Sequence, residues 1–230
     1  MRKIAIIAAL ALVLCGAFSL SAQATATLDF NCSPATAGSI SFGGPGTALV
    51  GTDIQVDSIT GIGTPLNDGV TLIITDGVLN FNTGIFTGLG EGEYDFAAGG
   101  SITLTGTTDH GSGLLLSGTF VSSPSVPHVV IGTGGGTVVG NFTDEKNLDL
   151  ITFFGLSPAD GYAFIGGKIN LAFSTASAIN PETATAFSSQ DVLSGDITNI
   201  ASPIPIPPSM VLLGSGLLGL VGFGIRRKQG

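Results

Sequence analysis

The chain has 230 residues, of which 43% are hydrophobic, only 10% are charged and 36 are glycine, and its formal net charge is −9. All 16 acidic residues lie between Asp29 and Asp196, where Lys146 and Lys168 are the only basic residues, so this central part carries sixteen negative and two positive charges. Such a charge repels phosphate backbones and argues against nucleic acid as a partner. The length suits a single domain with one core.

Residues 1–24 have the three parts of a secretory signal peptide. A basic start precedes an apolar run over residues 4–14. Ala24 and Ala26 each end a small-x-small triplet, so we expect cleavage after one of these two alanines. The partners implied are the Sec translocon and signal peptidase, and the protein is expected to be exported.

Cys32 is the only cysteine left if Cys15 is removed with the signal peptide. It then has no partner for an intramolecular disulfide. We expect a buried, small apolar side chain. A free thiol that pairs between molecules is the alternative.

The body, residues 27–200, reads as short strands separated by Gly, Asn, Asp and Pro turns. Asp76-Gly77 between two strand-like runs predicts a hairpin with a two-residue turn. Asp144-Glu145 beside Lys146 predicts another turn. Residues 174–202 lose the alternation and are expected to hold one last strand near 192–200. The strands expected elsewhere are 70–75, 78–82, 101–105, 114–121, 128–131, 137–142, 148–154 and 168–173.

The expected fold class is all-β, because periodicity typical of helices is absent outside the two ends of the chain. Two packed antiparallel sheets, as in a sandwich or jelly roll, are the natural way to bury one face of each strand. The order in which the strands pair cannot be read from the pattern.

One acidic cluster is the weak candidate for a metal site. Glu91, Glu93 and Asp95 alternate in sequence, so an extended segment would place all three on one side. Carboxylate oxygens suit Ca²⁺ at millimolar strength, although a solvated strand face is the simpler interpretation. No other cofactor is expected.

The catalytic motifs tested are absent. There is no Gly-x-Ser-x-Gly motif and no pair of histidines at metal spacing, since His110 and His128 are 18 positions apart. The chain is therefore not expected to be an enzyme, although a secreted hydrolase that uses two carboxylates is not excluded.

The tail, residues 201–230, has three parts. An uncharged apolar run over residues 210–225 is about 24 Å long as a helix, slightly short of a ~30 Å hydrocarbon core, and predicts a transmembrane helix. The basic cluster after it would hold the C-terminus in the cytoplasm. The prolines before it form a stiff, exposed spacer. The residues expected to serve sorting and processing here are Pro203, Ile204, Pro205, Ile206, Pro207, Pro208, Ser209, Arg226, Arg227 and Lys228.

This tail resembles the PEP-CTERM sorting signal of Gram-negative bacteria, in which a Pro-Glu-Pro-type motif, a glycine-containing membrane helix and an arginine cluster follow one another. The resemblance covers about the last 28 residues, and Ile204 and Ile206 stand where the family has glutamate. It implies cleavage near the prolines by an exosortase, a membrane cysteine transpeptidase. A plain stop-transfer anchor without processing is the alternative.

The resulting prediction is a structural or adhesion protein that is held at the inner membrane and then delivered to the cell surface or extracellular matrix. Extracellular polysaccharide and a role in biofilm are implied by the resemblance alone. The alternatives are a glycan- or calcium-binding β-sandwich module and a plain tail-anchored envelope protein.

Overall fold

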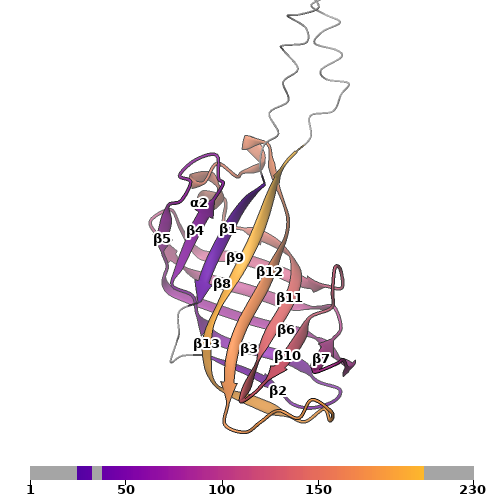
Figure 1. Cartoon of the computed structure of the whole chain (residues 1–230). Helices are drawn as coiled ribbons and strands as arrows, with labels where there is room; N and C mark the ends of the chain where they lie inside the picture. The colour runs from indigo at the N-terminus through magenta and orange to yellow at the C-terminus, as the bar shows by residue number, and fades with distance from the viewer. Residues whose placement is uncertain (1–24, 33–37, 205–230) are drawn as a thin grey trace, which may run out of the picture.

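The computed structural model describes residues 25–32 and 38–204, and this part of the chain is almost entirely antiparallel β-structure (Figure 1). All of its strands belong to one hydrogen-bonded sheet. The elements are β1 Ala26–Cys32, β2 Ser39–Phe42, β3 Ala48–Gln55, β4 Ser58–Ile62, β5 Thr71–Ile73, β6 Thr75–Leu89, β7 Glu93–Phe96, β8 Gly99–Thr108, β9 Gly111–Val121, β10 His128–Gly132, β11 Gly135–Lys146, α2 Leu148–Phe153, the 3₁₀ turn η1 Pro158–Asp160, β12 Tyr162–Thr175 and β13 Phe187–Pro203.

Eight of the strands form a closed ring in which each strand pairs with the next. The order is β13, β2, β3, β6, β8, β9, β11, β12 and back to β13. Two short branches extend the ring. β1, β4 and β5 continue outward from β13, and β7 and β10 bridge β6 and β11.

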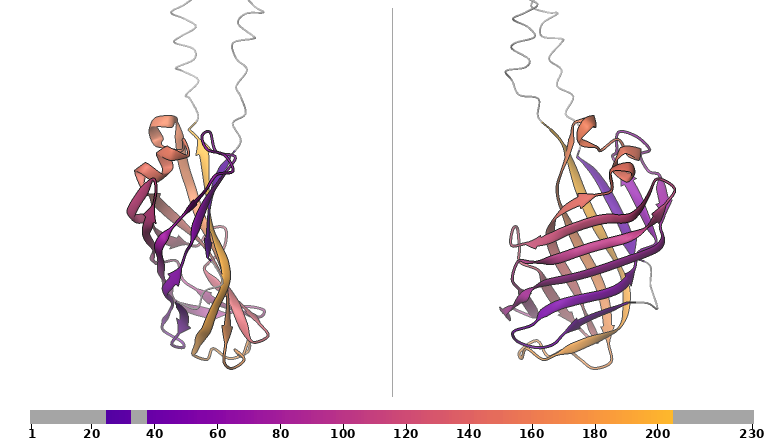
Figure 2. Two further views of the ribbon diagram at one scale, coloured as in Figure 1. Left: turned by 90° about the vertical axis from the view of Figure 1, so that its left-hand side faces the viewer. Right: turned by 180° about the vertical axis from the view of Figure 1, so that it is seen from behind.

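The ring is flattened into two walls whose strands cross one another (Figures 1 and 2). β1, β13, β12 and β11 lie in one wall, and β3, β6, β8 and β9 lie in the other. The expected all-β, antiparallel class is confirmed, but the prediction of two separate sheets is wrong. Long strands such as β6 and β13 change partners along their length, and bulges bend them, so the sheet continues from one wall into the other.

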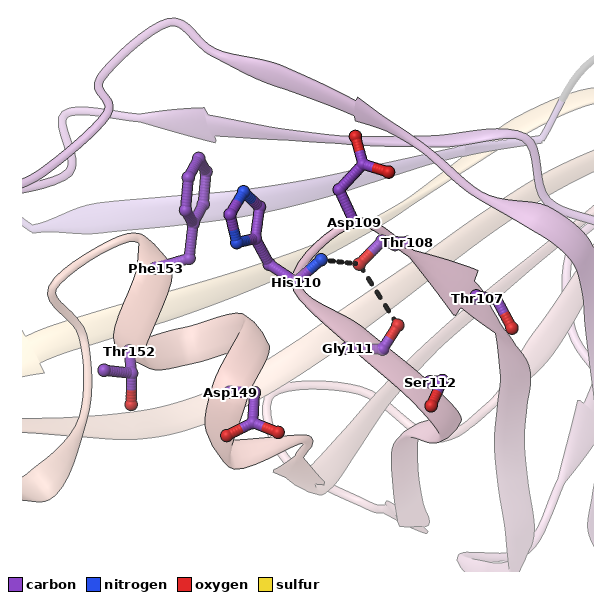
Figure 3. Close-up of a pocket in the computed structure, with 9 residues that line it drawn as sticks. All are labelled: Thr107, Thr108, Asp109, His110, Gly111, Ser112, Asp149, Thr152 and Phe153. Atoms are coloured by element: carbon purple, nitrogen blue, oxygen red, sulfur yellow. Dashed lines mark hydrogen bonds between the residues drawn. The ribbon is translucent and has the colours of Figure 1, made fainter.

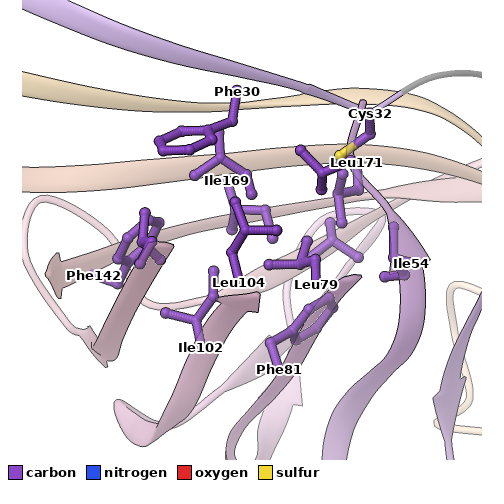
Figure 4. Packing of buried hydrophobic residues seen from close by; sticks show 14 of the residues in the cluster. Phe30, Cys32, Ile54, Leu79, Phe81, Ile102, Leu104, Phe142, Ile169 and Leu171 are labelled. Carbon is purple, nitrogen blue, oxygen red and sulfur yellow. The ribbon is translucent and has the colours of Figure 1, made fainter. Parts of the chain in front are cut away.

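The core fills the space between the walls (Figure 4). Leu79 and Phe81 of β6 and Ile102 and Leu104 of β8 face inward, as their alternation with polar residues predicts. Phe30, Ile169 and Leu171 meet them from the opposite wall. These side chains are 0 to 3% exposed, so the interior is a packed core.

The segment 148–154 is not a strand as expected but mostly the short helix α2. The side-chain oxygen of Asn147 accepts hydrogen bonds from the backbone N–H groups of Asp149 and Leu150, which caps the helix start. Leu150 and Ile151 are buried, so the apolar run that resembled a strand instead covers one end of the core.

The expected hairpin around Asp76-Gly77 is also wrong. β5 pairs with β4, and Asp76 and Gly77 lie within β6 as a bulge between Thr75 and Val78. The φ of Asp76 is +53°, which suits the dipeptide to a bulge as well as to a turn. The turn expected at Asp144-Glu145 is absent too, because β11 runs through to Lys146.

The last strand is longer than expected, and it brings the two ends of the body together. β13 extends to Pro203, so the first residues assigned to the tail belong to the sheet. Ala26 of β1 pairs with Ala201 of β13. The transmembrane helix predicted over 210–225 and the signal peptide lie outside the described residues. None of the helices in the part that the structure describes has the length and apolarity needed to cross a membrane.

Candidate functional site

Two neighbouring strands bring together three side chains that can bind a metal. Glu93 and Asp95 lie on β7, and His128 lies on β10, where it pairs directly with Asp95. One potential ligand atom from each residue lies within 4.8 Å of the others, and all three residues are partly buried. We call Glu93, Asp95 and His128 the acidic–histidine cluster.

The His128 ring is held in one orientation by the backbone. Its Nδ1 lies 2.8 Å from the carbonyl oxygen of Val126. A carbonyl oxygen only accepts hydrogen bonds, so Nδ1 carries the proton and the lone pair is on Nε2. A backbone partner of this kind typically orients a histidine that binds metal.

β7 itself is firmly anchored, because the residues that alternate with the two acids point into the core. Tyr94 and Phe96 are fully buried and pack edge-on against Phe42, with ring centroids 5.6 and 5.4 Å away. The Tyr94 hydroxyl lies 2.6 Å from the carbonyl oxygen of Asn180 and 2.7 Å from that of Thr183. The positions of Glu93 and Asp95 are therefore fixed by a rigid strand.

Gly90, in the turn before β7, lies beside both carboxylates, so a side chain at this position would touch them. A Cβ atom at this position would lie 3.6 Å from Asp95 Oδ2 and 3.8 Å from Glu93 Oε2. The backbone N–H of Gly90 donates to the carbonyl of Glu93 at 2.9 Å, which holds the turn against the strand.

The sequence predicted only part of this cluster. Glu93 and Asp95 do share one side of a strand, as expected, but Glu91 lies in the preceding turn and is not one of the three grouped residues. His128 was missed because it lies 33 positions after Asp95, and β7–β10 pairing is not readable from the pattern. The alternation around His128 predicted a strand over 128–131 but not that this strand pairs with β7.

A second candidate site is an open depression of about 630 Å³ beside the β8–β9 turn (Figure 3). The exposed His110 ring stacks on Phe153 of α2, with centroids 4.0 Å apart. Asp109 from the turn and Asp149 from α2 add two carboxylates. The turn is held locally, because Thr108 Oγ1 donates to the Gly111 carbonyl at 3.2 Å and accepts from the His110 N–H at 3.1 Å. This arrangement offers a flat ring and acceptors to a polar ligand.

One ion pair lies inside the body, where both of its side chains are shielded from solvent. Lys146 and Asp144 of β11 pair with each other, and their side chains are 0% and 1% exposed. Burial lowers the pKa of Lys146 to about 8, and burial raises the pKa of Asp144 although Lys146 opposes that change. Burying the two charges of this pair therefore costs free energy.

Two further groups have shifted pKa values. Burial, and then the neighbouring Asp196 carboxylate, raises the pKa of Asp29 above its ordinary value. Burial, followed by the charges of Asp196, Asp57 and Asp29, raises the pKa of the Cys32 thiol to about 12. Cys32 is 5% exposed and free, so the prediction of a buried small side chain is confirmed.

The described residues include only three of those assigned to processing. Ala26 is fully buried in β1, Pro203 ends β13, and the backbone N–H of Ile204 donates to the Gly161 carbonyl at 2.7 Å. The others lie outside the described residues; they are Ala24, Pro205, Ile206, Pro207, Pro208, Ser209, Arg226, Arg227 and Lys228.

No protein-family model, curated protein or solved structure matches the chain.

Proposed function

We propose that this protein is an exported structural or adhesion protein of the cell surface or extracellular matrix, held at the inner membrane and then sorted by its C-terminal tail. The observation that carries the proposal is the pairing of Ala26 with Ala201. It brings the end of the predicted signal peptide and the start of the tail to one end of the body. If the signal peptide or the tail joins the body to a membrane, this end of the body faces the membrane and the other end points away from it.

The body itself supports a structural role. Its two walls enclose a packed core of buried side chains, which makes the body a stable unit. Its sixteen acids against two lysines keep it soluble outside the membrane.

The fold also sharpens where processing should occur. Ala26 is buried and paired, so cleavage by signal peptidase after Ala24 preserves β1, whereas cleavage after Ala26 removes its first residue. At the other end, the Ile204 N–H is bonded to Gly161. A cut that preserves this bond lies after Ile204, so within the expected proline region we expect processing between Pro205 and Ser209.

The test is the intact mass of the protein recovered from its native host, in membrane and extracellular fractions. We expect an extracellular species that begins at Thr25 and ends between 205 and 209, with or without added mass. A variant in which Arg226, Arg227 and Lys228 are all alanine should stay unprocessed. Its control is Lys168→Ala, which removes a basic residue of the body and should be processed normally. A protein that ends at Gly230 and is found only in the inner membrane, in a host that has an exosortase, would instead establish a plain tail anchor.

A second candidate function, glycan binding, is favoured by the depression beside α2. The stack on Phe153 fixes the exposed His110 ring as a flat surface, and Asp109 and Asp149 lie beside it as acceptors for sugar hydroxyls. Calorimetry with acidic and neutral polysaccharides tests it. Binding that Phe153→Ala and Asp149→Asn both weaken supports the candidate, and heat signals that neither variant changes refute it.

A further inference from the structure

We propose that Glu93, Asp95 and His128 bind one divalent transition-metal ion of the Zn²⁺ class. This inference goes beyond the proposed surface role and does not depend on it. It rests on the geometry of the three side chains, on the charge they leave unbalanced, and on the kind of atoms they offer.

The three side chains lie close enough together to share one ion. The three potential ligand atoms lie within 4.8 Å of one another, yet no hydrogen bond or ion pair joins the side chains among the described residues. Zn²⁺ binds oxygen and nitrogen at about 2.0–2.2 Å. Two ligand atoms on one Zn²⁺ ion therefore lie somewhat closer to each other than 4.8 Å. Binding therefore requires the carboxylate side chains to move toward the ion.

The negative charge of the two carboxylates favours a bound cation. Glu93 and Asp95 project from the same side of β7, and both carboxylates lie beside Gly90. The only ion pair in residues 25–32 and 38–204 is that between Lys146 and Asp144, so neither carboxylate is paired with a lysine. Two partly buried carboxylates held close together repel each other, and a divalent ion between them removes that repulsion.

The ligand atoms select the kind of metal. Ca²⁺ takes six to eight oxygen ligands, whereas imidazole nitrogen suits Zn²⁺, Cu²⁺ and Ni²⁺. His128 is already oriented for this role, because the Val126 carbonyl fixes its Nδ1 proton and leaves the Nε2 lone pair free. Three protein ligands at a partly exposed position leave room for a water or an external ligand on the metal.

The test is calorimetric titration of full-length protein in detergent, without a histidine tag and freed of metal. We expect one Zn²⁺ per chain, and Ca²⁺ binding that is weaker by at least about tenfold. His128→Ala and Asp95→Asn should each weaken Zn²⁺ binding by at least about tenfold, because even partners that only orient a ligand contribute 10- to 100-fold.

The matched controls are His110→Ala and Glu91→Gln, which remove a histidine and an acid outside the cluster and should leave binding unchanged. Circular dichroism checks that each variant is folded. Co²⁺ absorption gives a readout on the unaltered chain, since four-coordinate ligation by nitrogen and oxygen produces visible bands much stronger than those of hydrated Co²⁺. Absent Co²⁺ bands together with no saturable Zn²⁺ binding, or Zn²⁺ binding that His128→Ala leaves intact, would overturn the proposal. Equal Ca²⁺ and Zn²⁺ affinities would overturn the assignment of the metal class.

Discussion

The amine of Lys146 lies 3.8 Å from the centre of the Phe164 ring, inside the body and paired with Asp144. A cation above a ring face gains electrostatic energy, and the gain is larger where water is excluded. The interior nevertheless disfavours the charge, since burial lowers the pKa of Lys146 to about 8. One oxygen of Asp144 has no hydrogen-bond partner. We therefore expect the buried pair to contribute less stability than apolar side chains would in its place.

Removing one partner of this pair should destabilise the protein far more than removing both. Asp144→Leu leaves Lys146 buried without its carboxylate and should lower the free energy of unfolding by about 3–5 kcal/mol. The double variant Asp144→Leu/Lys146→Met should lie within about 1 kcal/mol of the natural protein or above it, because apolar side chains of similar volume replace the pair. Urea denaturation at pH 7 measures both. A double variant as unstable as the single one would contradict the argument.

The same lysine should make stability rise with pH. Between its pKa of about 8 in the folded protein and its ordinary value of 10.5, the unfolded chain binds a proton that the folded chain does not. Raising the pH across this range therefore favours folding. We expect the stability of the natural protein relative to the double variant to increase from pH 7.5 to pH 9.5. Using this difference cancels the opposing effect of Cys32, which both proteins share.

The Cys32 thiol should be unreactive in the folded protein. A pKa of about 12, against an ordinary value of 9.0, leaves very little thiolate at pH 8, and the side chain is 5% exposed. Iodoacetamide should modify native Cys32 at least about 100-fold more slowly than the urea-unfolded chain. The experiment uses Cys15→Ser protein so that one thiol is followed. Equal rates would show that the thiol is accessible.

Asp29→Asn should stabilise the protein at neutral pH. Burial and Asp196 raise the pKa of Asp29, so the folded state binds its proton more tightly than the unfolded state, and stability falls as pH rises above the ordinary value of 3.8. The variant should therefore melt at a higher temperature at pH 7, and the difference should vanish below about pH 3.8. Asp76→Asn, on an exposed bulge, is the control and should show no such trend.

The bulge in β6 should not tolerate a side chain at Gly77. A Cβ atom there would lie 2.0 Å from the Val56 carbonyl oxygen, although the Val56 N–H must keep its 3.1 Å bond to the Gly77 carbonyl. Gly77→Ala should cost about 1–3 kcal/mol or more, as overpacking does. Gly88→Ala, in the same strand with open space around its Cβ position, should be neutral or stabilise the protein by up to about 1 kcal/mol, because alanine restricts the unfolded chain more than glycine does. Similar losses in both would refute the close contact as the cause.

Alternation predicted the strands that face the core on one side only, and Leu79 and Phe81 show why. Each inward residue is followed by a polar one that faces solvent, so period and burial agree. Alternation gave the wrong element where the same local sequence is compatible with two structures. An apolar run after Asn147 became a helix because the asparagine caps it, and Asp76-Gly77 became a bulge because β6 continues past it to β3 and β8.

The site depended on information that no single stretch contains. Glu93 and Asp95 follow from alternation within one strand, whereas His128 reaches them only through β7–β10 pairing. The buried pair was similarly hidden. Asp144 and Lys146 look like turn residues in a sequence, and only the inward register set by Phe142 places them inside.

Closure of the strand ring through β13 has a consequence for the order of events during biogenesis. β13 contacts β1, β2 and β12 at once, yet it is the last strand of the body to leave the ribosome. Until residues 187–203 are available, three strands lack their partner, and the longest-range contacts cannot form. The ring of strands can therefore close only after the whole body, including β13, has been synthesised.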